Sequence, residues 1–457
     1  MEDPADQHNN ERTEFIKFDR YLEAVSSLDK TLAITPKDKM AWYRRGNLLV
    51  KLGQQEKAIA SYDNALAIDP DIIDAWNYDD VEMWTKRGEV LRHLGRYEES
   101  VASYDKALVS YGKVIALEKE APDYHGVGDL TPNSIGAKAW NSRGEVLLQL
   151  GRYEESVTSF YRAVCIDPNI ASAWNSRGLA LYHLGQYKQA LTFFDKALSL
   201  TPEYEAIWTN RGDALGKLGQ PIAAGAAYDM SLAFKLVNFG RYTEALASFD
   251  RALAITPDYS YGWYSRGDLL VKLGLYEEAV ASYDKALARH SKNKNYPQIW
   301  NSRGNALVNL RRYTEAIDSF NNALASFDNA HTDELYEPPD INIWKNLGNA
   351  LVYIGQYAEA LVFFQNALKF EPHDTDTWHS CGFAHYLLGQ YGEAVASFDS
   401  VIAIDQRDAE AWNYRGLALT NLGRYSEAVD SYDKALTINP KYTLARQNRD
   451  FVLMNLT

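Results

Sequence analysis

Cysteine is scarce in this sequence, and no stretch of it is strongly apolar. Only two cysteines occur in 457 residues, Cys165 and Cys381, in dissimilar surroundings. This scarcity excludes a disulfide-stapled scaffold and suits a reducing compartment. No apolar run approaches the ~18 residues that a membrane span needs. The first residues are polar and acidic, with no apolar segment of the kind that directs secretion. We therefore expect a cytoplasmic protein that does not engage a membrane.

Positive charge is also in short supply. The chain holds 47 Lys and Arg against 61 Asp and Glu, a formal net charge of -14, and no local basic stripe offsets it. Such a chain repels phosphate backbones, so we expect no nucleic-acid partner.

Catalytic signatures are missing as well. The sequence has no Walker loop, GxGxxG, GxSxG, HExxH or CxxC pair. Cys381 and His385 stand one helical turn apart, but no third ligand is evident, so a buried packing variation is the interpretation preferred over a metal site. We expect a protein that is not an enzyme and that has no catalytic residues, no cofactor and no bound metal.

What the sequence does contain is a repeat with a period of about 34 residues. The spacing from Trp140 to Trp174 is the same as that from Trp174 to Trp208, and behind each Trp the same frame returns. Counted from Trp, the frame has Gly at +4, mostly Leu at +7, Gly at +11, Tyr at +13, a small residue at +16, an aromatic at +20, Ala at +23 and often Pro at +28. The apolar offsets have helical spacing on both sides of the +11 Gly. Each copy therefore predicts two helices joined by a tight Gly turn, here called the first and the second helix.

This pattern resembles the tetratricopeptide repeat in period, helix count and placement of Trp, Gly, Tyr, Ala, aromatic and Pro. The resemblance implies an all-α, right-handed α-solenoid of stacked hairpins covering nearly the whole chain, with about twelve repeats. Ten copies begin with Trp, and two degenerate copies lie near Tyr21 and Gly240. The final segment, 443–457, predicts a single capping helix.

The period breaks between Trp208 and Trp263. Two full periods after Trp208 would place the leading Trp at position 276, and Trp263 comes well before it. About one helix is missing, so we expect the solenoid to be interrupted near residues 221–257, by an unusually long helix or by a helix out of alternation. The expected organisation is an N-terminal lobe at 1–239 with the copies led by Trp42, Trp84, Trp140, Trp174 and Trp208, a C-terminal lobe at 240–442 with those led by Trp263, Trp300, Trp344, Trp378 and Trp412, and the capping helix at 443–457.

Arg stands at +3 in eight of the ten Trp-led copies, and Asp is frequent at +21. The second helix of one copy should pack on the first helix of the next, so each +21 residue faces the following +3 residue. Eight junctions then pair Asp with Arg: Asp29/Arg45, Asp63/Arg87, Asp105/Arg143, Asp195/Arg211, Asp250/Arg266, Asp284/Arg303, Asp399/Arg415 and Asp433/Arg449.

The exceptions to the pairing are informative. The two copies without Arg carry Leu347 and Cys381, opposite Asn321 and Gln365, so Arg and Asp are lost together. We predict a structural latch, an ion pair that fixes the register between neighbouring repeats; a ladder of Arg residues gripping a ligand is the alternative. At a single junction Arg177 faces Tyr161, where no Asp is available.

The first helices of such repeats line the concave groove in the family resembled, and the +1, +5 and +9 positions should form an exposed stripe on one helix face. Asn is frequent there, and its amide both donates and accepts hydrogen bonds, so it could pair with the backbone of an extended peptide. Ordinary solvated positions are the other interpretation. The peptide-binding candidates are Asn301, Asn305, Asn309, Lys345, Asn349, Tyr353, Asn141, Asn175 and Asn413.

Four insertions lengthen the connections between one copy and the next, and all should lie on one rim. The largest begins with "SYDKALV" followed by "SYGKVIA", which predicts a second helix about two turns longer than usual. Tolerated drift and partner contact are both open interpretations of these loops.

The function expected from the sequence is a non-catalytic protein–protein interaction scaffold that binds an extended segment in its groove. The alternative is an assembly or regulatory subunit that engages its partner through the rim loops and the convex face. The partner should be a protein or peptide of basic or neutral character, because the chain is acidic. The sequence leaves the oligomeric state open.

Overall fold

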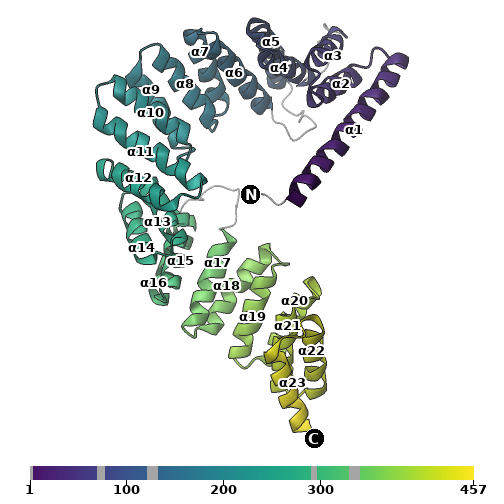
Figure 1. Cartoon of the computed structure of the whole chain (residues 1–457), viewed down its shortest axis with the longest axis vertical. Helices are drawn as coiled ribbons and strands as arrows, with labels where there is room; N and C mark the ends of the chain where they lie inside the picture. Colours follow the sequence, from purple (N-terminus) through teal and green to yellow (C-terminus); the bar gives the residue numbers. More distant parts are fainter. Residues whose placement is uncertain (1–3, 69–77, 121–131, 290–295, 329–339, 457) are drawn as a thin grey trace. The chain divides into compact units, whose positions relative to one another are not determined.

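The computed structural model describes residues 4–68, 78–120, 132–289, 296–328 and 340–456. Within these ranges the chain forms 23 α-helices and no strand (Figure 1). Twenty of the helices pair into the ten Trp-led hairpins. The predicted all-α helical-repeat solenoid is therefore confirmed.

The hairpins follow one another along the chain, each with its first helix before its second. They are α2 (Lys39–Lys51) and α3 (Gln55–Ala67); α4 (Tyr78–His93) and α5 (Tyr97–Glu120); α6 (Pro132–Gln149) and α7 (Tyr153–Ile166); α8 (Ala171–His183) and α9 (Tyr187–Leu198); α10 (Glu205–Lys217) and α11 (Pro221–Asn238); α13 (Ser260–Lys272) and α14 (Tyr276–Ala288); α15 (Pro297–Asn309) and α16 (Tyr313–Asp328); α17 (Ile341–Tyr353) and α18 (Tyr357–Phe370); α19 (Thr375–Leu387) and α20 (Tyr391–Ile404); and α21 (Ala409–Asn421) and α22 (Tyr425–Ile438).

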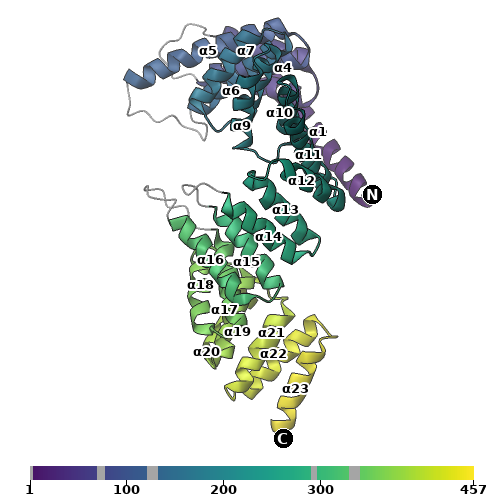
Figure 2. The same ribbon diagram turned by 90° about the vertical axis from the view of Figure 1, so that its left-hand side faces the viewer.

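Three helices stand outside these hairpins: α1 (Pro4–Ile34), α12 (Tyr242–Ile255) and α23 (Thr443–Leu456). The degenerate copies near Tyr21 and Gly240 are thus not hairpins with a first helix of their own. Their recognisable second-helix residues lie on α1 and α12. The capping helix predicted at the end of the chain is present as α23, which packs against α22 and α21 (Figure 2).

The turn inside each hairpin depends on the glycine at +11. Gly185 has a φ of 75°, in the left-handed region that glycine reaches without steric cost. The backbone N–H of Gln186 then donates to the Leu181 carbonyl at 2.9 Å, which ends the first helix with a Schellman-type hydrogen bond. Arg311 occupies this place in one hairpin with a φ of 60°, a conformation that costs a non-glycine residue energy.

The two helices of a hairpin approach most closely where the +4 glycine meets the +20 ring. At Gly178, an added Cβ would lie 2.7 Å from the Phe194 ring, which is fully buried. The same contact recurs between Gly304 and Phe320 at 2.4 Å. The +4 glycine is therefore required by packing, and the aromatic at +20 is among the largest fully buried side chains in every hairpin except that of α10 and α11, where Tyr228 is 41% exposed.

In six of the hairpins, the leading Trp donates a hydrogen bond to the connection before it. The Trp174 indole N–H donates to the Pro168 carbonyl at 2.8 Å, and Trp378 does the same to Pro372 at 2.9 Å. The +28 Pro of one copy and the Trp of the next are therefore two halves of one contact. This explains why they recur together in most copies where the period is unbroken.

The chain divides into two compact units, Met1–Lys235 and Leu236–Thr457, and the division falls inside α11. This helix has 18 residues, whereas the second helices of unbroken copies have 12 to 14. The next helix, α12, is again a second-helix equivalent, so first-helix and second-helix alternation is lost here. The predicted interruption, with an unusually long helix, is confirmed. The lobe boundary at 239/240 stays a prediction.

The longest second helix is α5, with 24 residues, and it confirms the extension expected from the duplicated heptapeptide. The predicted placement of the insertion loops on one rim concerns residues 69–77, 121–131, 290–295 and 329–339, which lie outside the described residues. No helix in the described ranges has both the length and the apolar character needed to cross a membrane.

Candidate peptide-binding face and the ladders that support it

The side of the second helices carries a ladder of Arg–Asp ion pairs between repeats. All eight junctions expected from the sequence are formed, with N–O distances of 2.6–2.9 Å. The pairs are Arg45–Asp29, Arg87–Asp63, Arg143–Asp105, Arg211–Asp195, Arg266–Asp250, Arg303–Asp284, Arg415–Asp399 and Arg449–Asp433. In every pair the Asp belongs to one repeat and the Arg to the helix that follows it.

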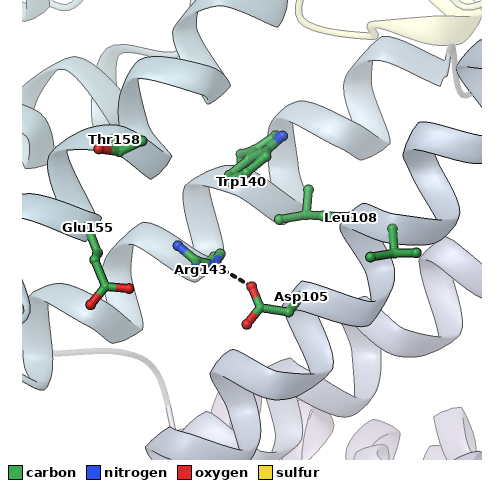
Figure 3. A pocket seen from close by; sticks show the side chains of 7 residues that line it. Asp105, Leu108, Trp140, Arg143, Glu155 and Thr158 are labelled. Atoms are coloured by element: carbon green, nitrogen blue, oxygen red, sulfur yellow. Dashed lines mark hydrogen bonds and ion pairs between the residues drawn. The ribbon is translucent and has the colours of Figure 1, made fainter.

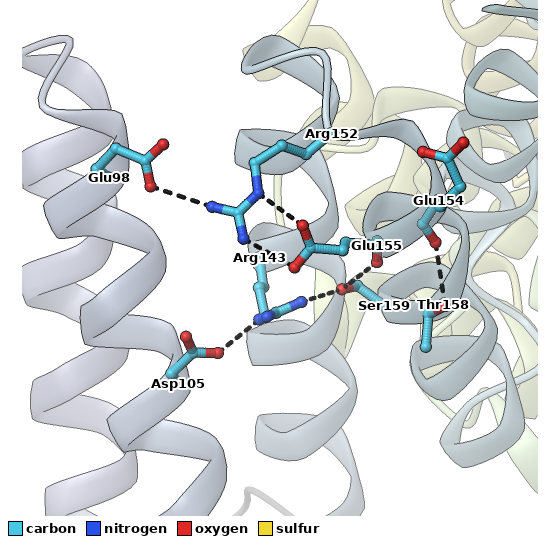
Figure 4. A network of polar contacts seen from close by, with 8 residues as sticks. All are labelled: Glu98, Asp105, Arg143, Arg152, Glu154, Glu155, Thr158 and Ser159. Atoms are coloured by element: carbon cyan, nitrogen blue, oxygen red, sulfur yellow. Dashed lines mark hydrogen bonds and ion pairs between the residues drawn. The ribbon is translucent and has the colours of Figure 1, made fainter. Parts of the chain in front are cut away.

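Six of the eight rungs also have a third member that sequence reasoning missed. Arg143 donates through Nε to Asp105 at 2.7 Å and through Nη1 to the Ser159 hydroxyl at 2.7 Å (Figure 4). Ser159 stands at +19 of the same repeat as Arg143, so the guanidinium spans two second helices. Five other rungs have the same serine: Ser61, Ser103, Ser282, Ser319 and Ser431. The recurrence of Ser at +19 is visible in the sequence and could have indicated this contact.

A second ladder runs beside the first and was also missed. Arg152 holds Glu155 of its own repeat at 2.7 Å and Glu98 of the preceding repeat at 3.1 Å (Figure 4). The hydrogen bonds from Arg152 hold the pKa of Glu155 below its ordinary value. Arg96 and Arg312 make the same two-sided contact. These pairs are more exposed than the first ladder, so each contributes little to stability.

One surface cavity adjoins the first ladder. It measures about 600 Å³ and is lined by Leu108, Val109, Trp140 and the Arg143–Asp105 pair, with Glu155 and Thr158 on its far side (Figure 3). The Arg143 guanidinium is bound to Asp105 and to Ser159, so its charge is compensated and it does not make the cavity a site for an anion.

The predicted peptide-binding residues lie on the first helices of the hairpins. Three of them are on α15. The side-chain oxygen of Asn301 accepts a hydrogen bond from the side-chain NH₂ group of Asn346 on α17 at 3.1 Å, so one of the two polar groups of the Asn301 amide is already bound. Asn305 is half-buried, and Asn309 is exposed and donates to the Asn305 backbone oxygen at 2.9 Å. Of these residues, Asn305 keeps the freest side-chain amide.

The next first helix, α17, carries Lys345, Asn349 and Tyr353. Lys345 is bound to Asp374, the N-cap of α19, at 2.9 Å, so its charge is neutralised inside the protein. Asn349 is exposed and accepts from the Ser380 hydroxyl at 3.2 Å, which leaves its NH₂ group available. Tyr353 is 62% exposed and stacks on Tyr313, with ring centroids 4.7 Å apart.

The remaining three candidates serve the fold. Asn413 is 2% exposed, and its carbonyl oxygen accepts from Asn448 at 3.0 Å. Asn175 accepts from Asn210 in the same way at 3.0 Å, and Asn141 donates to Glu145 at 2.9 Å. A buried, hydrogen-bonded Asn413 has no surface to offer a peptide, so we leave it out of the site proposed below.

These contacts define a third ladder, in which an Asn at +1 accepts from an Asn at +2 of the next first helix. It joins Asn175 to Asn210, Asn301 to Asn346 and Asn413 to Asn448. Sequence reasoning assigned the +1 Asn to ligand binding because it did not compare that position with +2 of the following repeat. The frequent Asn residues at +1 are therefore explained in large part by repeat-to-repeat contact.

A cavity of about 380 Å³ lies between the next two first helices, α19 and α21. Its walls include Phe383, which is 38% exposed, and Tyr414, whose ring stacks on the buried Phe398 at 5.6 Å. Exposed Asp376 and Glu410 stand at its edge. The cavity thus combines aromatic surface with two carboxylates.

His379, which lines this cavity, is bound to a residue of the neighbouring helix. His379 Nε2 lies 2.8 Å from Asp408, the N-cap of α21. Burial by itself would raise the pKa of Asp408, but the hydrogen bonds from His379 and from the helix backbone bring it below its ordinary value. Both the Lys345–Asp374 and the His379–Asp408 contacts therefore tie a first helix to the start of the next one.

Cys381 and His385 do not form a ligand pair. Cys381 is 3% exposed, and burial raises the pKa of its thiol to about 12. His385 Nδ1 lies 2.7 Å from the Gln390 side chain. Among the residues that the structure describes, no group of three or more His, Cys, Asp or Glu side chains is placed to hold a metal ion.

Comparison with known families agrees with this architecture. Tetratricopeptide repeat family models match residues 40–72, 171–204, 341–374 and 409–442, and also 72–114, 232–294 and 264–331; a further TPR repeat model matches 144–185. Together they cover about two thirds of the chain. The chain belongs to the tetratricopeptide repeat family, whose stacked hairpins typically act as non-catalytic scaffolds that bind other proteins or peptides.

Several solved structures are similar at low identity. A crystal structure of YrrB, described as a TPR protein with an unusual peptide-binding site, is 26% identical, with a TM-score of 0.38 over 44% of this chain and 97% of that one. The Cut9–Hcn1 hetero-tetramer of APC/C is 15% identical, with a TM-score of 0.38 over 97% and 95%. The type IV pilus biogenesis factor PilW is 23% identical, with a TM-score of 0.39 over 50% and 98%. A search of curated proteins found no match.

Proposed function

We propose that the protein is a non-catalytic scaffold that binds an extended peptide segment along the first helices of its second unit. The proposed surface runs over α15, α17, α19 and α21 and contains Asn305, Asn309, Asn349, Tyr353 and the cavity at Phe383. The observation that carries the proposal is that accessible amides on α15 and α17, which keep unused hydrogen-bonding groups, are followed by accessible aromatic rings on α17, α19 and α21.

Continuity between the helices supports this surface. Ser380, which lines the α19–α21 cavity, donates to Asn349 on α17, so the polar stripe and the cavity are adjoining. An extended segment could place backbone groups on Asn305 and Asn349 and an apolar side chain against Phe383 and Tyr414. Each amide contact contributes about 0.5–1.5 kcal/mol, so measurable affinity requires several repeats together.

The charge of this surface favours a basic or neutral segment. Lys345 and His379 are bound to Asp374 and Asp408, whereas Asp376 and Glu410 form no ion pair within the described residues. The uncompensated carboxylates at the cavity would attract a Lys or Arg of the partner and repel an acidic one.

The test uses short peptides selected from a phage-displayed library on the full chain, with affinity measured by fluorescence polarisation. The double variant Asn305→Ala/Asn349→Ala removes two amides from α15 and α17. We expect it to weaken the selected peptides by about tenfold, the equivalent of ~1.4 kcal/mol. The melting temperature should change little, because neither amide is buried.

The matched control is Asn322→Ala/Asn366→Ala, which removes two amides from the second helices α16 and α18 of the same two repeats. It should leave peptide affinity unchanged. Equal loss in both double variants, or no loss in the first, would show that the first-helix surface does not bind the peptides. Loss of binding on shortening residues 329–339, with the first double variant unaffected, would favour the rim-loop alternative.

A further inference from the structure

One arginine of the first ladder has lost both of its acceptors. At the other junctions the +3 Arg binds Asp at +21 of the preceding repeat, and in most of them also Ser at +19 of its own. Arg177 instead meets Tyr161 at the Asp position and Phe193 at the Ser position. Its Nε is buried and has no hydrogen-bond partner, and no carboxylate of the described residues is in ion-pair distance.

The chain shows what happens elsewhere when these acceptors are absent. In the hairpin of α17 and α18, Asn321 stands in place of the Asp and Phe363 in place of the Ser, and the arginine is replaced by the buried Leu347. Leucine is therefore the fitting residue beside a phenylalanine at +19. The repeat at Trp174 also has a phenylalanine at +19, yet it keeps the cation although neither the Asp nor the Ser acceptor is present.

The geometry of Arg177 is that of a guanidinium held in place between two rings. Its Cζ lies 4.1 Å from the Phe193 ring centroid and 5.0 Å from that of Tyr161. Phe193 in turn stacks on Trp174 at 5.8 Å. Burial lowers the pKa of Arg177, in contrast to the arginines of the second ladder, whose pKa their carboxylate partners raise. Stacking fixes the plane of the side chain. Arg177 as a whole is half-buried although its Nε is buried, so part of the side chain other than Nε is accessible to a ligand.

We propose that Arg177, Tyr161 and Phe193 form a binding site for a side-chain carboxylate of an acidic segment from another protein. The repeats themselves indicate this ligand, because an Asp carboxylate fills the equivalent place at eight junctions of this chain. A planar guanidinium pairs with a carboxylate through two parallel hydrogen bonds. Tyr161 is 49% exposed, so the edge of the site is open to a partner.

This site is independent of the groove proposed above. It is formed by α7, α8 and α9 in the first unit and lies on the side of the second helices. It also selects the opposite charge, since the uncompensated group is a cation here and a pair of carboxylates at the α19–α21 cavity. One scaffold would thus hold an acidic segment in its first unit and a basic or neutral one in its second.

The experiment pans a phage-displayed peptide library on the full chain and retains the clones that the Arg177→Leu variant fails to bind. Leucine at this position is the residue that the chain itself uses beside Phe363, so the variant should fold, which circular dichroism verifies. We expect the retained peptides to carry Asp or Glu and to bind Arg177→Leu at least tenfold more weakly. Tyr161→Asp supplies an internal carboxylate and should release the same peptides while Arg177 is still present.

Arg162→Leu is the control, because it removes an exposed charge directly after Tyr161 in the sequence. It should leave the retained peptides bound. The proposal is overturned if no clone distinguishes wild type from Arg177→Leu, if the distinguishing clones lack acidic residues, if Arg162→Leu weakens them equally, or if Tyr161→Asp binds them like wild type. Selective binding of inorganic phosphate or a phosphopeptide instead of Asp- or Glu-containing peptides would likewise replace the carboxylate assignment.

Discussion

At the scale of the residue, the glycine at +4 decides how closely the two helices of a hairpin can approach. On α10, Gly212 faces the Tyr228 ring, and an added Cβ would lie 2.6 Å from it. One helical turn later on the same helix, Gly216 has nothing within 4 Å of the corresponding Cβ position. The helix therefore provides its own control for the effect of a methyl group.

We expect Gly212→Ala to lower stability by about 1–3 kcal/mol, since the inserted methyl forces the ring or a helix to move. Gly216→Ala should instead raise it by about 0.5–1 kcal/mol, because alanine restricts the unfolded chain and favours the helix. Thermal melts followed by circular dichroism compare the two variants. Shifts of the same sign and size would mean that the ring contact does not set the helix spacing.

A second residue-scale prediction concerns Asp268. Its carboxylate accepts a hydrogen bond from Tyr283 at 2.7 Å, and burial raises its pKa above the ordinary value. For an acid with a raised folded pKa, the stabilising contribution is full below the unfolded pKa and is lost as pH rises through the folded pKa. In another repeat, Asn47 stands at +5 as Asp268 does, and its side-chain oxygen accepts a hydrogen bond from Tyr62 at 2.8 Å. A neutral amide therefore suits this position.

Asp268→Asn should therefore melt at a higher temperature than wild type at pH 7. The difference should shrink as the pH approaches about 4, where an ordinary Asp becomes protonated. Melting temperatures measured from pH 4 to pH 8 give the result. A difference that does not vary with pH, or a variant less stable than wild type at pH 7, contradicts the role assigned to burial of Asp268.

Residue patterns alone identified the ion-paired ladder but not its full set of partners. The joint loss of Arg and Asp at Leu347 and Asn321 made the pairing visible, because two positions change together. The +19 serines and the ladder at Arg152 recur just as regularly, but only the structure shows which atoms they meet. The sequence shows that Arg311 stands at the turn position where the other copies have Gly. That its backbone adopts a positive φ is seen only in the structure.

At the scale of the element, the Arg303–Asp284 rung joins α15 to α14 with a distance of 2.7 Å. The Arg side chain is 17% exposed and the Asp side chain 53%, so solvent screens part of the attraction. Asp284→Asn leaves Arg303 with Ser319 as its remaining partner, whereas the double variant Arg303→Leu/Asp284→Asn reproduces the natural pair of Leu347 and Asn321.

A double-mutant cycle should give a coupling of about 0.5–1 kcal/mol between Arg303 and Asp284. The double variant should be no less stable than Asp284→Asn, because removing the arginine also removes an uncompensated, partly buried charge. A cycle between Arg303 and Glu277, which binds Arg312 instead, should give none. Zero coupling in the first cycle would mean that the rung does not contribute to the register.

Helix α11 shows how much of an irregular element sequence can predict. The shortened spacing from Trp208 to Trp263 requires that one helix be absent or shared, and α11 with 18 residues, followed by α12, confirms this. The degenerate copies were less predictable. Their second-helix residues kept the repeat spacing, but the absence of a separate first helix depends on whether the preceding segment has a turn of its own.

At the scale of the whole molecule, the repeat frame predicted the fold almost completely, because each hairpin packs only on its neighbours and local spacing fixes each contact. The binding surface was harder to predict from sequence. The +1 and +5 positions belong to the same predicted stripe of a first helix, but Asn413 at +1 is buried and bound by Asn448 of the following helix, whereas Asn349 at +5 is exposed. Function in such an array therefore depends on which polar groups are left unused after the repeats have stacked.

The most direct test of this account is hydrogen–deuterium exchange on the full chain, with and without a peptide selected as described above. Binding along the first helices predicts added protection in α15, α17, α19 and α21, the four helices that carry the proposed surface. The second helices α16, α18 and α20 should change far less. Protection confined to residues 329–339, or to the second helices, would contradict the proposed binding face.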